Sequence, residues 1–306
     1  MGWLGGFLIA SALGAIALYF LFPGVALRFA MGLARRIGRL HLREVEVDGH
    51  RLPYLEGGQG EPLLLLHGFG GNKDHWTMIA PHLTPHFHVY APDLPGFGDA
   101  TRDTGAAYDL DAQIARIAAF AEQLGLDRFH LAGNSMGGYL AAHFAARHPE
   151  RVSSLWLLAP AGVADAEDSE VMTMIERGDN PLITTDMAAF DRLTRLCFAV
   201  PPAMPKQFKR PLLARARAEA AWNERMFEAI FARPQALDNV AAQLPARLLV
   251  AWGDEDRILH ASALSTLAGL CPQAECLLMV RMGHVPMIER PAHTAQDYLR
   301  WHGIVR

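Results

Sequence analysis

Runs of apolar residues alternate with segments of helical periodicity along most of the chain. Residues 62–66 and 247–252 are short apolar runs followed by turn-forming residues, which is typical of buried strands. Residues 129–132 and 275–279 predict two further short strands. Apolar positions recur at helical spacing in residues 138–145, 262–270 and 291–301. This alternation predicts an α/β fold, in which a mainly parallel sheet is flanked by helices.

One further region adds strands to this predicted core, and another is an insertion within it. Residues 42–47 and 52–56 alternate between polar and apolar, which predicts an antiparallel strand pair. Residues 161–234 lie between proline-rich breaks and predict an inserted helical cap, or lid. Met and Phe recur there at helical spacing, and we expect most to pack on the core and a minority to face substrate. The core would comprise residues 42–160 and 235–306.

The N-terminal residues form a third region. Residues 1–27 contain no Lys, Arg, Asp or Glu, and residues 3–22 are about as long as a bilayer core requires. A signal peptide would carry positive charge before its apolar part, whereas here the arginines follow it. Residues 1–41 therefore predict an uncleaved, single-pass transmembrane helix with an Arg-rich juxtamembrane segment, which places the folded domain that follows it in the cytoplasm. Residues 25–40 mix apolar residues with arginine, as interfacial helices do.

Composition excludes some partners and cofactors. The 306 residues suffice for one large α/β domain with an insertion, and the net charge of −4 gives no reason to expect a nucleic-acid partner. Three cysteines cannot form a disulfide framework. The histidines at 82, 86 and 88 match no familiar zinc spacing. We therefore expect no metal, no organic cofactor and no obligatory protein partner, only a small-molecule substrate and a membrane.

The sequence Gly-Asn-Ser-Met-Gly at residues 133–137 stands between a predicted strand and a predicted helix. In that context Gly-x-Ser-x-Gly marks a strained turn that exposes a serine hydroxyl, although the pattern alone is weak. Ser135 would be a nucleophile, which needs a histidine to accept its proton and a carboxylate to orient that histidine.

Both partners are expected on later strand ends. Among the fourteen histidines, His284 stands out because it follows a predicted strand and a glycine, and precedes the C-terminal helix. The strand at residues 247–252 leads into Asp254, Glu255 and Asp256. Spacing alone leaves open which of these carboxylates is the acid.

A glycine-rich loop follows the strand at residues 62–66. Its sequence, His-Gly-Phe-Gly-Gly at residues 67–71, lets a backbone N–H face a developing oxyanion. The candidate donors are the N–H of Phe69 and the N–H of Met136, which directly follows the proposed nucleophile.

From about residue 45 to residue 301 the chain resembles the α/β-hydrolase superfamily. The resemblance rests on the glycine-rich loop followed by Trp76, on Asp-Leu-Pro-Gly-Phe-Gly at residues 93–98, on the serine turn, on Trp-Gly-Asp-Glu-Asp at residues 252–256, and on Gly-His at residues 283–284. In this superfamily the acid usually stands three residues after the glycine of the Trp-Gly turn, which implies Asp256.

A closer resemblance is to membrane-anchored monoacylglycerol lipases of the α/β-hydrolase-domain group. It rests on Lys73 and Asp74 after the glycine-rich loop, on cap segments such as residues 196–198, and on the apolar N-terminus. It implies a serine hydrolase that cleaves carboxylic esters of lipid-like substrates, such as monoacylglycerols, through an acyl-enzyme. Hydrolases that cleave C–C bonds of ring-fission diketones share the serine turn and remain an alternative. A non-catalytic, ligand-binding protein of the same fold is a second alternative.

Overall fold

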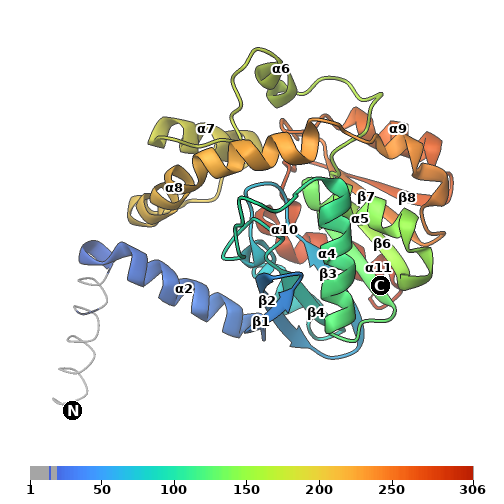
Figure 1. Cartoon of the computed structure of the whole chain (residues 1–306), viewed down its shortest axis with the longest axis horizontal. Coiled ribbons are helices and arrows are strands. Elements are labelled where there is room, and N and C mark those ends of the chain that lie inside the picture. The colour runs from blue at the N-terminus through green and yellow to red at the C-terminus, as the bar shows by residue number, and fades with distance from the viewer. Residues whose placement is uncertain (1–13, 15–18, 306) are drawn as a thin grey trace.

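The computed structural model describes residue 14 and residues 19–305 of the chain. Figure 1 shows a central sheet with helices on both faces and a further group of helices above it. The strands are β1 (His41–Val47), β2 (His50–Gly58), β3 (Glu61–Leu66), β4 (Phe87–Pro92), β5 (Phe129–Asn134), β6 (Val152–Leu158), β7 (Leu248–Gly253) and β8 (Ala274–Met279). The helices are α2 (Pro23–Ile37), α3 (Ala80–Leu83), α4 (Leu110–Gln123), α5 (Met136–Arg147), α6 (Glu170–Glu176), α7 (Met187–Cys197), α8 (Lys206–Phe231), α9 (Ser262–Leu270), α10 (Pro286–Glu289) and α11 (Pro291–Trp301).

The eight strands form one mixed sheet in the order β1-β2-β4-β3-β5-β6-β7-β8. From β4 to β8 the neighbours run parallel, whereas β1 pairs with β2, and β2 with β4, antiparallel. The parallel core and the antiparallel pair at residues 42–47 and 52–56 are therefore as predicted. Because the parallel strands end at one edge, the loops that follow β3, β5, β7 and β8 are brought together there.

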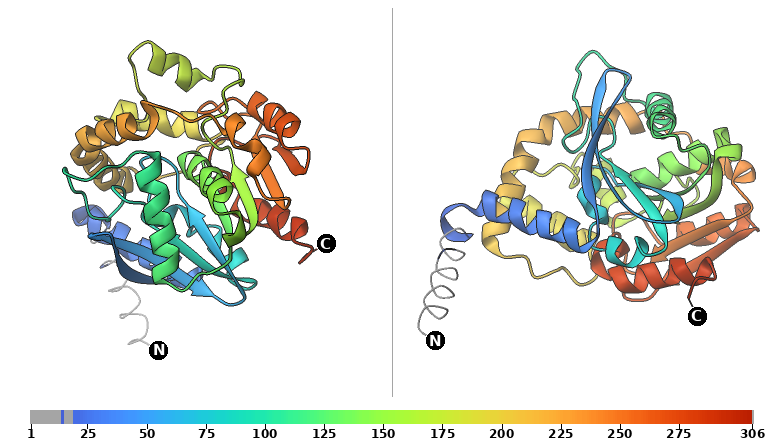
Figure 2. Two further views of the ribbon diagram at one scale, coloured as in Figure 1. Left: turned by 45° about the vertical axis from the view of Figure 1, so that its right-hand side comes forward. Right: turned by 90° about the horizontal axis from the view of Figure 1, so that it is seen from below.

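Side chains alternate between two cores, one on each face of the sheet. Leu64 and Leu66 pack with residues of α4, α5 and α9, whereas Leu63 and Leu65 pack with residues of α3 and α11. Both faces of the central strands are buried, which explains why these strands appear in the sequence as continuous apolar runs. The left view of Figure 2 shows α4 and α5 side by side over one face.

Three helices, α6, α7 and α8, lie between β6 and β7 in the chain and above the sheet in Figure 1. The α6 segment is attached to the loop after β7, because Ser169 Oγ donates to the carbonyl of Ile258 at 2.7 Å. Val171, Leu196 and Ile258 form a small apolar cluster that joins α6, α7 and this loop. The 26-residue helix α8 contains Pro211 and extends over the loops at the edge of the sheet.

The N-terminal part of the described chain is the helix α2, which leads directly into β1. No helix within the described residues is long and apolar enough to cross a membrane. The predicted span at residues 3–22 lies mostly outside the described residues, since only residues 14 and 19–22 of it are described. A transmembrane anchor therefore stays a prediction.

Candidate active site

Ser135 occupies a strained turn between β5 and α5. Its φ of 57° and ψ of −120° lie in a region that side-chain-bearing residues rarely adopt. A Cβ added to Gly133 would lie 2.2 Å from the carbonyl oxygen of Gly137, and one added to Gly137 would lie 2.2 Å from that of Leu66. Only glycine fits these two close approaches, so the flanking glycines permit the turn that presents the half-buried Ser135.

The helix that begins directly after Ser135 places the positive end of its dipole at the serine turn, which favours negative charge there. Met136 is the first residue of α5, a twelve-residue helix, so its N–H belongs to the unpaired positive end of the helix. The backbone of Ser135 is held by three hydrogen bonds, since its N–H donates to the carbonyl of Leu158 and its carbonyl accepts the N–H groups of Tyr139 and Ala161. An oxyanion formed on a substrate attached to Ser135 would meet this helix end.

The candidate base and acid lie in contact. His284 Nδ1 is 2.7 Å from Asp256 Oδ2, and both side chains are almost completely buried. The other carboxylate oxygen of Asp256, Oδ1, accepts the backbone N–H groups of Ile258 at 2.8 Å and Leu259 at 3.0 Å. With both its oxygens engaged, the Asp256 carboxylate is fixed in direction and accepts the Nδ1 proton, which leaves Nε2 of His284 as the proton acceptor.

The neighbouring carboxylates are placed elsewhere. Asp254 Oδ1 accepts the backbone N–H of Met282 at 3.2 Å, which ties the ends of the β7 and β8 loops together. Glu255 is exposed. Of the three carboxylates that spacing left open, Asp256 is the one that contacts His284.

The loop that carries His284 is held by groups to which the sequence analysis assigned no role. Asn134 Nδ2 donates to the carbonyl of His284 at 2.9 Å and so connects the serine turn to the histidine loop. The N–H of His284 donates to the carbonyl of Cys197 at the end of α7. Glu289 accepts the N–H groups of Gly283 at 3.0 Å and Val200 at 2.8 Å. Asn134 belongs to the serine motif, whereas Glu289 has no signal in the sequence.

The glycine-rich loop lies beside Ser135. A Cβ built on Gly68 would come within 3.3 Å of the Cβ of Ser135. The loop is held by His67, whose Nε2 accepts the N–H of Leu94 at 3.0 Å and whose Nδ1 donates to the carbonyl of Gly68 at 2.8 Å. Burial lowers the pKa of His67 to about 3, so this ring stays neutral and structural at neutral pH.

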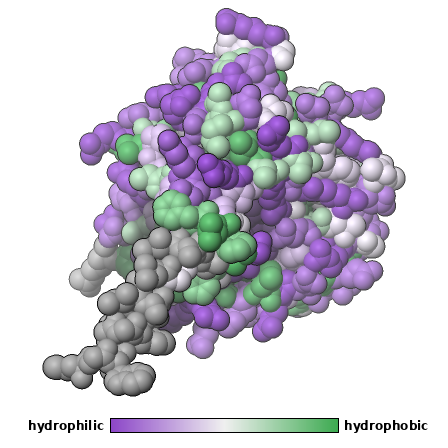
Figure 3. All heavy atoms as spheres, turned by 90° about the vertical axis from the view of Figure 1, so that its left-hand side faces the viewer, coloured by the Kyte–Doolittle hydropathy of each residue, from purple (hydrophilic) through white to green (hydrophobic). Residues whose placement is uncertain are grey.

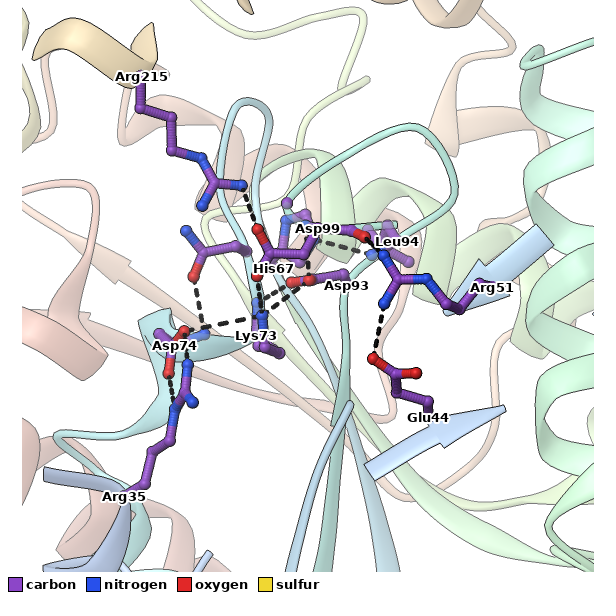
Figure 4. A network of polar contacts seen from close by, with 12 residues as sticks. Arg35, Glu44, Arg51, His67, Lys73, Asp74, Asp93, Leu94, Asp99 and Arg215 are labelled. Atoms are coloured by element: carbon purple, nitrogen blue, oxygen red, sulfur yellow. Dashed lines mark hydrogen bonds and ion pairs between the residues drawn. The ribbon is translucent and has the colours of Figure 1, made fainter. Parts of the chain in front are cut away.

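A network of ion pairs lies next to the glycine-rich loop at residues 67–71 (Figure 4). Lys73, 1% exposed, lies between Asp93 and Asp99, with Nζ–Oδ2 distances of 2.9 and 2.8 Å. Burial alone would lower the pKa of Lys73, but the two carboxylates outweigh it and raise that pKa, so the lysine is charged. Asp99 also pairs with Arg215 of α8 at 3.0 Å, and Asp74 pairs with Arg35 of α2. The network thus joins the oxyanion loop to α8 and to α2.

Aromatic side chains of α8 cover the candidate oxyanion loop. Phe69 meets the ring of Phe227 edge-on at 5.5 Å between centroids, and Phe231 at 6.4 Å. The ring of Phe97 also meets that of Phe69 edge-on, at 5.5 Å between centroids. Met226 is completely buried in the same core. Met226 and Phe231 of α8 therefore pack on the core, and Phe227 and Phe231 contact Phe69, the residue whose N–H is a candidate oxyanion donor.

Two other reactive groups have different surroundings. Cys197 is near Asp256, and burial together with that carboxylate raises the pKa of its thiol to about 12, so it is a neutral thiol rather than a second nucleophile. Among the described residues, no group of three or more His, Cys, Asp or Glu side chains could hold a metal ion. Of the three histidines that we considered for zinc, His88 contacts Glu56 at 3.0 Å.

Comparison with known proteins agrees with this geometry. Residues 61–291 match the family model of the alpha/beta hydrolase fold. The chain is 34% identical to Lipase 1 of Psychrobacter immobilis over 84% of this chain and 82% of that protein. It is 28% identical to the monoacylglycerol lipase abhd6-B of Xenopus laevis over 95% and 91%. A solved structure described as a membrane phospholipase A, a bacterial virulence factor, matches with a TM-score of 0.90 and 41% identity over 99% of this chain and 98% of that one. The chain belongs to the α/β-hydrolase fold family, and its likeness to lipases places it among the carboxylic ester hydrolases of that family.

Proposed function

We propose that the protein is a serine hydrolase that cleaves carboxylic esters of lipids through an acyl-enzyme, with Ser135, His284 and Asp256 as its catalytic triad. The single observation that carries this proposal is the 2.7 Å contact between His284 and Asp256 at the sheet edge where Ser135 occupies its strained turn. Monoacylglycerols are the proposed substrates, because relatives that align over nearly the whole chain bear the name monoacylglycerol lipase.

The mechanism follows from the positions of these groups. His284 Nε2 takes the proton of Ser135 as the hydroxyl attacks the ester carbonyl, and Asp256 stabilises the imidazolium that forms. The N–H groups of Phe69 and Met136 donate to the oxyanion of the tetrahedral intermediate. His284 then protonates the leaving alcohol, and water releases the acyl group from Ser135 by the same steps. Each of these steps is carried by protein groups alone.

The helices α6, α7 and α8 are proposed to form the lid, within residues 161–234, over a core of residues 42–160 and 235–306. Phe227 and Phe231 of α8 support this assignment, since they pack against Phe69 and would offer apolar surface to an acyl chain. Residues 1–41 are proposed to hold the enzyme at a membrane, with a span at residues 3–22 and the catalytic domain in the cytoplasm. The uncharged run followed by arginines supports that placement.

Fluorophosphonate labelling of the purified full-length protein tests the nucleophile. Ser135→Ala should abolish labelling and lower ester hydrolysis by several powers of ten, whereas the matched variant Ser265→Ala, at an exposed position in α9, should behave as wild type. Labelling that survives in folded Ser135→Ala would remove Ser135 from the role.

A substrate panel tests the class. Extending the acyl chain of a monoacylglycerol from four to eight carbons should raise kcat/KM by on the order of a hundredfold, at about 0.8 kcal/mol per buried methylene. Rates are compared below the critical micelle concentration, beside a ring-fission diketone. Flat or falling kcat/KM with rapid diketone cleavage would move the protein to the C–C bond hydrolases. Ligand binding without any turnover would favour the non-catalytic alternative.

A further inference from the structure

The helix α2 has one apolar face that the rest of the described chain does not cover. Its most exposed apolar side chains recur four residues apart, with exposed fractions of 41%, 70%, 51% and 61% for Val25, Phe29, Leu33 and Ile37. This spacing places them along one side of a helix. Phe20, Leu21 and Phe22 extend the same exposed surface toward the N-terminus, each at least 58% exposed. Figure 3 shows hydrophobic side chains gathered next to the N-terminal end of the described chain.

The charges on this helix are all of one sign. The sequence of α2 contains Arg28, Arg35 and Arg36 but neither Asp nor Glu. Arg28 and Arg36 are exposed and stand beside the apolar stripe, where their long side chains can reach outward. Arg39 follows the helix end and is exposed as well. An exposed face with apolar residues and only positive charge matches the chemistry of an anionic lipid surface.

The segment that contains α2 is fixed to the enzyme just before the helix begins and again near its end. Near its start, Tyr19 donates to Gln207 of α8 at 2.7 Å and meets the ring of Phe208 edge-on. Near its end, Arg35 donates two bonds of 2.7 Å to the carboxylate of Asp74. Asp74 belongs to the 3-10 turn η1 (Lys73–Trp76), which follows the oxyanion loop. The direction of the apolar stripe is therefore set relative to both α8 and the active site.

We infer that α2 lies in the plane of an anionic bilayer, with the stripe at residues 25, 29, 33 and 37 in the acyl region and its arginines at the headgroups. Residues 1–22, which precede α2 in the sequence, contain no charged side chain and so suit the same lipid surface by composition. Because α2 is bonded to α8 and η1, its docking holds the lid and the oxyanion loop at a fixed orientation to the lipid surface. This inference adds to the proposed function how the enzyme meets the membrane. It rests on the proposed function in one respect, namely that the substrate comes from the bilayer.

A fluorophore placed on the stripe tests this docking without any need for catalysis. The full chain with Phe29→Cys carries an environment-sensitive label and is reconstituted into vesicles of phosphatidylcholine and phosphatidylglycerol that contain brominated acyl chains. Val280→Cys is the matched control, because Val280 is 64% exposed and follows β8, which is the outermost strand on the side of the sheet away from β1. Labelling of the unsubstituted chain gives the background from its three free cysteines.

We expect the label at residue 29 to be quenched at least threefold more strongly than the label at residue 280. Phe29→Asp should lower hydrolysis of a vesicle-borne monoacylglycerol at least tenfold and leave hydrolysis of a short soluble ester within twofold, whereas Val280→Asp should change neither. Equal quenching at the two positions would overturn the inference. So would a signal at residue 29 that depends on protein concentration and not on brominated lipid, because the stripe would then join two copies of the chain. A protein that hydrolyses no ester refutes the proposed function, while the quenching still decides the docking.

Discussion

The contact between Asp256 and His284 allows a sharp prediction for the isosteric change Asp256→Asn. Oδ1 of Asp256 accepts two backbone N–H groups, from Ile258 and Leu259. The asparagine oxygen will occupy that position, because an NH2 group there would face two donors. Its NH2 group must then point at Nδ1 of His284, where it can only donate.

A donor at this position forces His284 into the wrong tautomer. Nδ1 becomes the acceptor, the ring proton moves to Nε2, and Nε2 can no longer accept the proton of Ser135. In serine proteases the equivalent change lowers kcat about 10⁴-fold, which corresponds to about 5.5 kcal/mol of activation free energy. We expect a loss of the same order here, with little change in KM for a short soluble ester.

The matched control is Asp254→Asn. The Oδ1 of Asp254 accepts one N–H, from Met282, and an asparagine oxygen preserves that bond. Its kcat should stay within about threefold of wild type, since it contacts no catalytic group. The assay is steady-state hydrolysis of a p-nitrophenyl ester, with the melting temperature as a check on folding. The reasoning is refuted if Asp256→Asn keeps more than a tenth of wild-type kcat, or if Asp254→Asn is the more damaged enzyme.

Three further outcomes follow from the groups around the site. Lys73→Met should lower the free energy of unfolding by about 3–5 kcal/mol in urea titrations, because it leaves Asp93 buried and unpaired, and adding Asp93→Asn should recover part of that loss; an additive double variant would contradict the pairing. The contribution of neutral His67 to the free energy of unfolding should be fully present above the unfolded histidine pKa of about 6.5. It should fall as the pH drops toward 3, by about 2 kcal/mol at pH 5 for His67 alone, because the unfolded chain binds a proton there and the buried ring does not. That pH dependence should shrink in His67→Gln, and an unchanged slope would assign it to other groups. Phe227→Ala, which uncovers Phe69, should reduce kcat/KM for an eight-carbon ester at least fivefold more than for a two-carbon ester, and equal losses would exclude Phe227 from the acyl pocket.

Much of the fold, and the serine turn, could be predicted from the sequence because they depend on local interactions. Continuous apolar runs are typical of strands buried on both faces, and β3, β5 and β7 lie where such runs predicted them. The last predicted strand is β8, which is partly exposed at the end of the sheet. The serine turn was also largely local, because a Cβ on Gly133 would meet the carbonyl oxygen of Gly137, four residues on, in the turn that holds Ser135 at a positive φ. In each case the interacting atoms are close neighbours in the chain, or belong to one regular element, so the sequence pattern alone determines the geometry.

The tertiary structure decided what depends on residues far apart in the chain. Asp254 and Asp256 follow the same strand with the same charge, and only the position of the β8 loop directs one to Met282 and the other to His284. Likewise, Lys73 looks like a surface lysine until Asp93 and Asp99 enclose it. The side of α2 that faces outward was also decided by the tertiary structure, because Tyr19 contacts α8 and Arg35 contacts Asp74. These choices rest on distances of a few ångströms between segments many residues apart, which a pattern of polar and apolar positions does not encode.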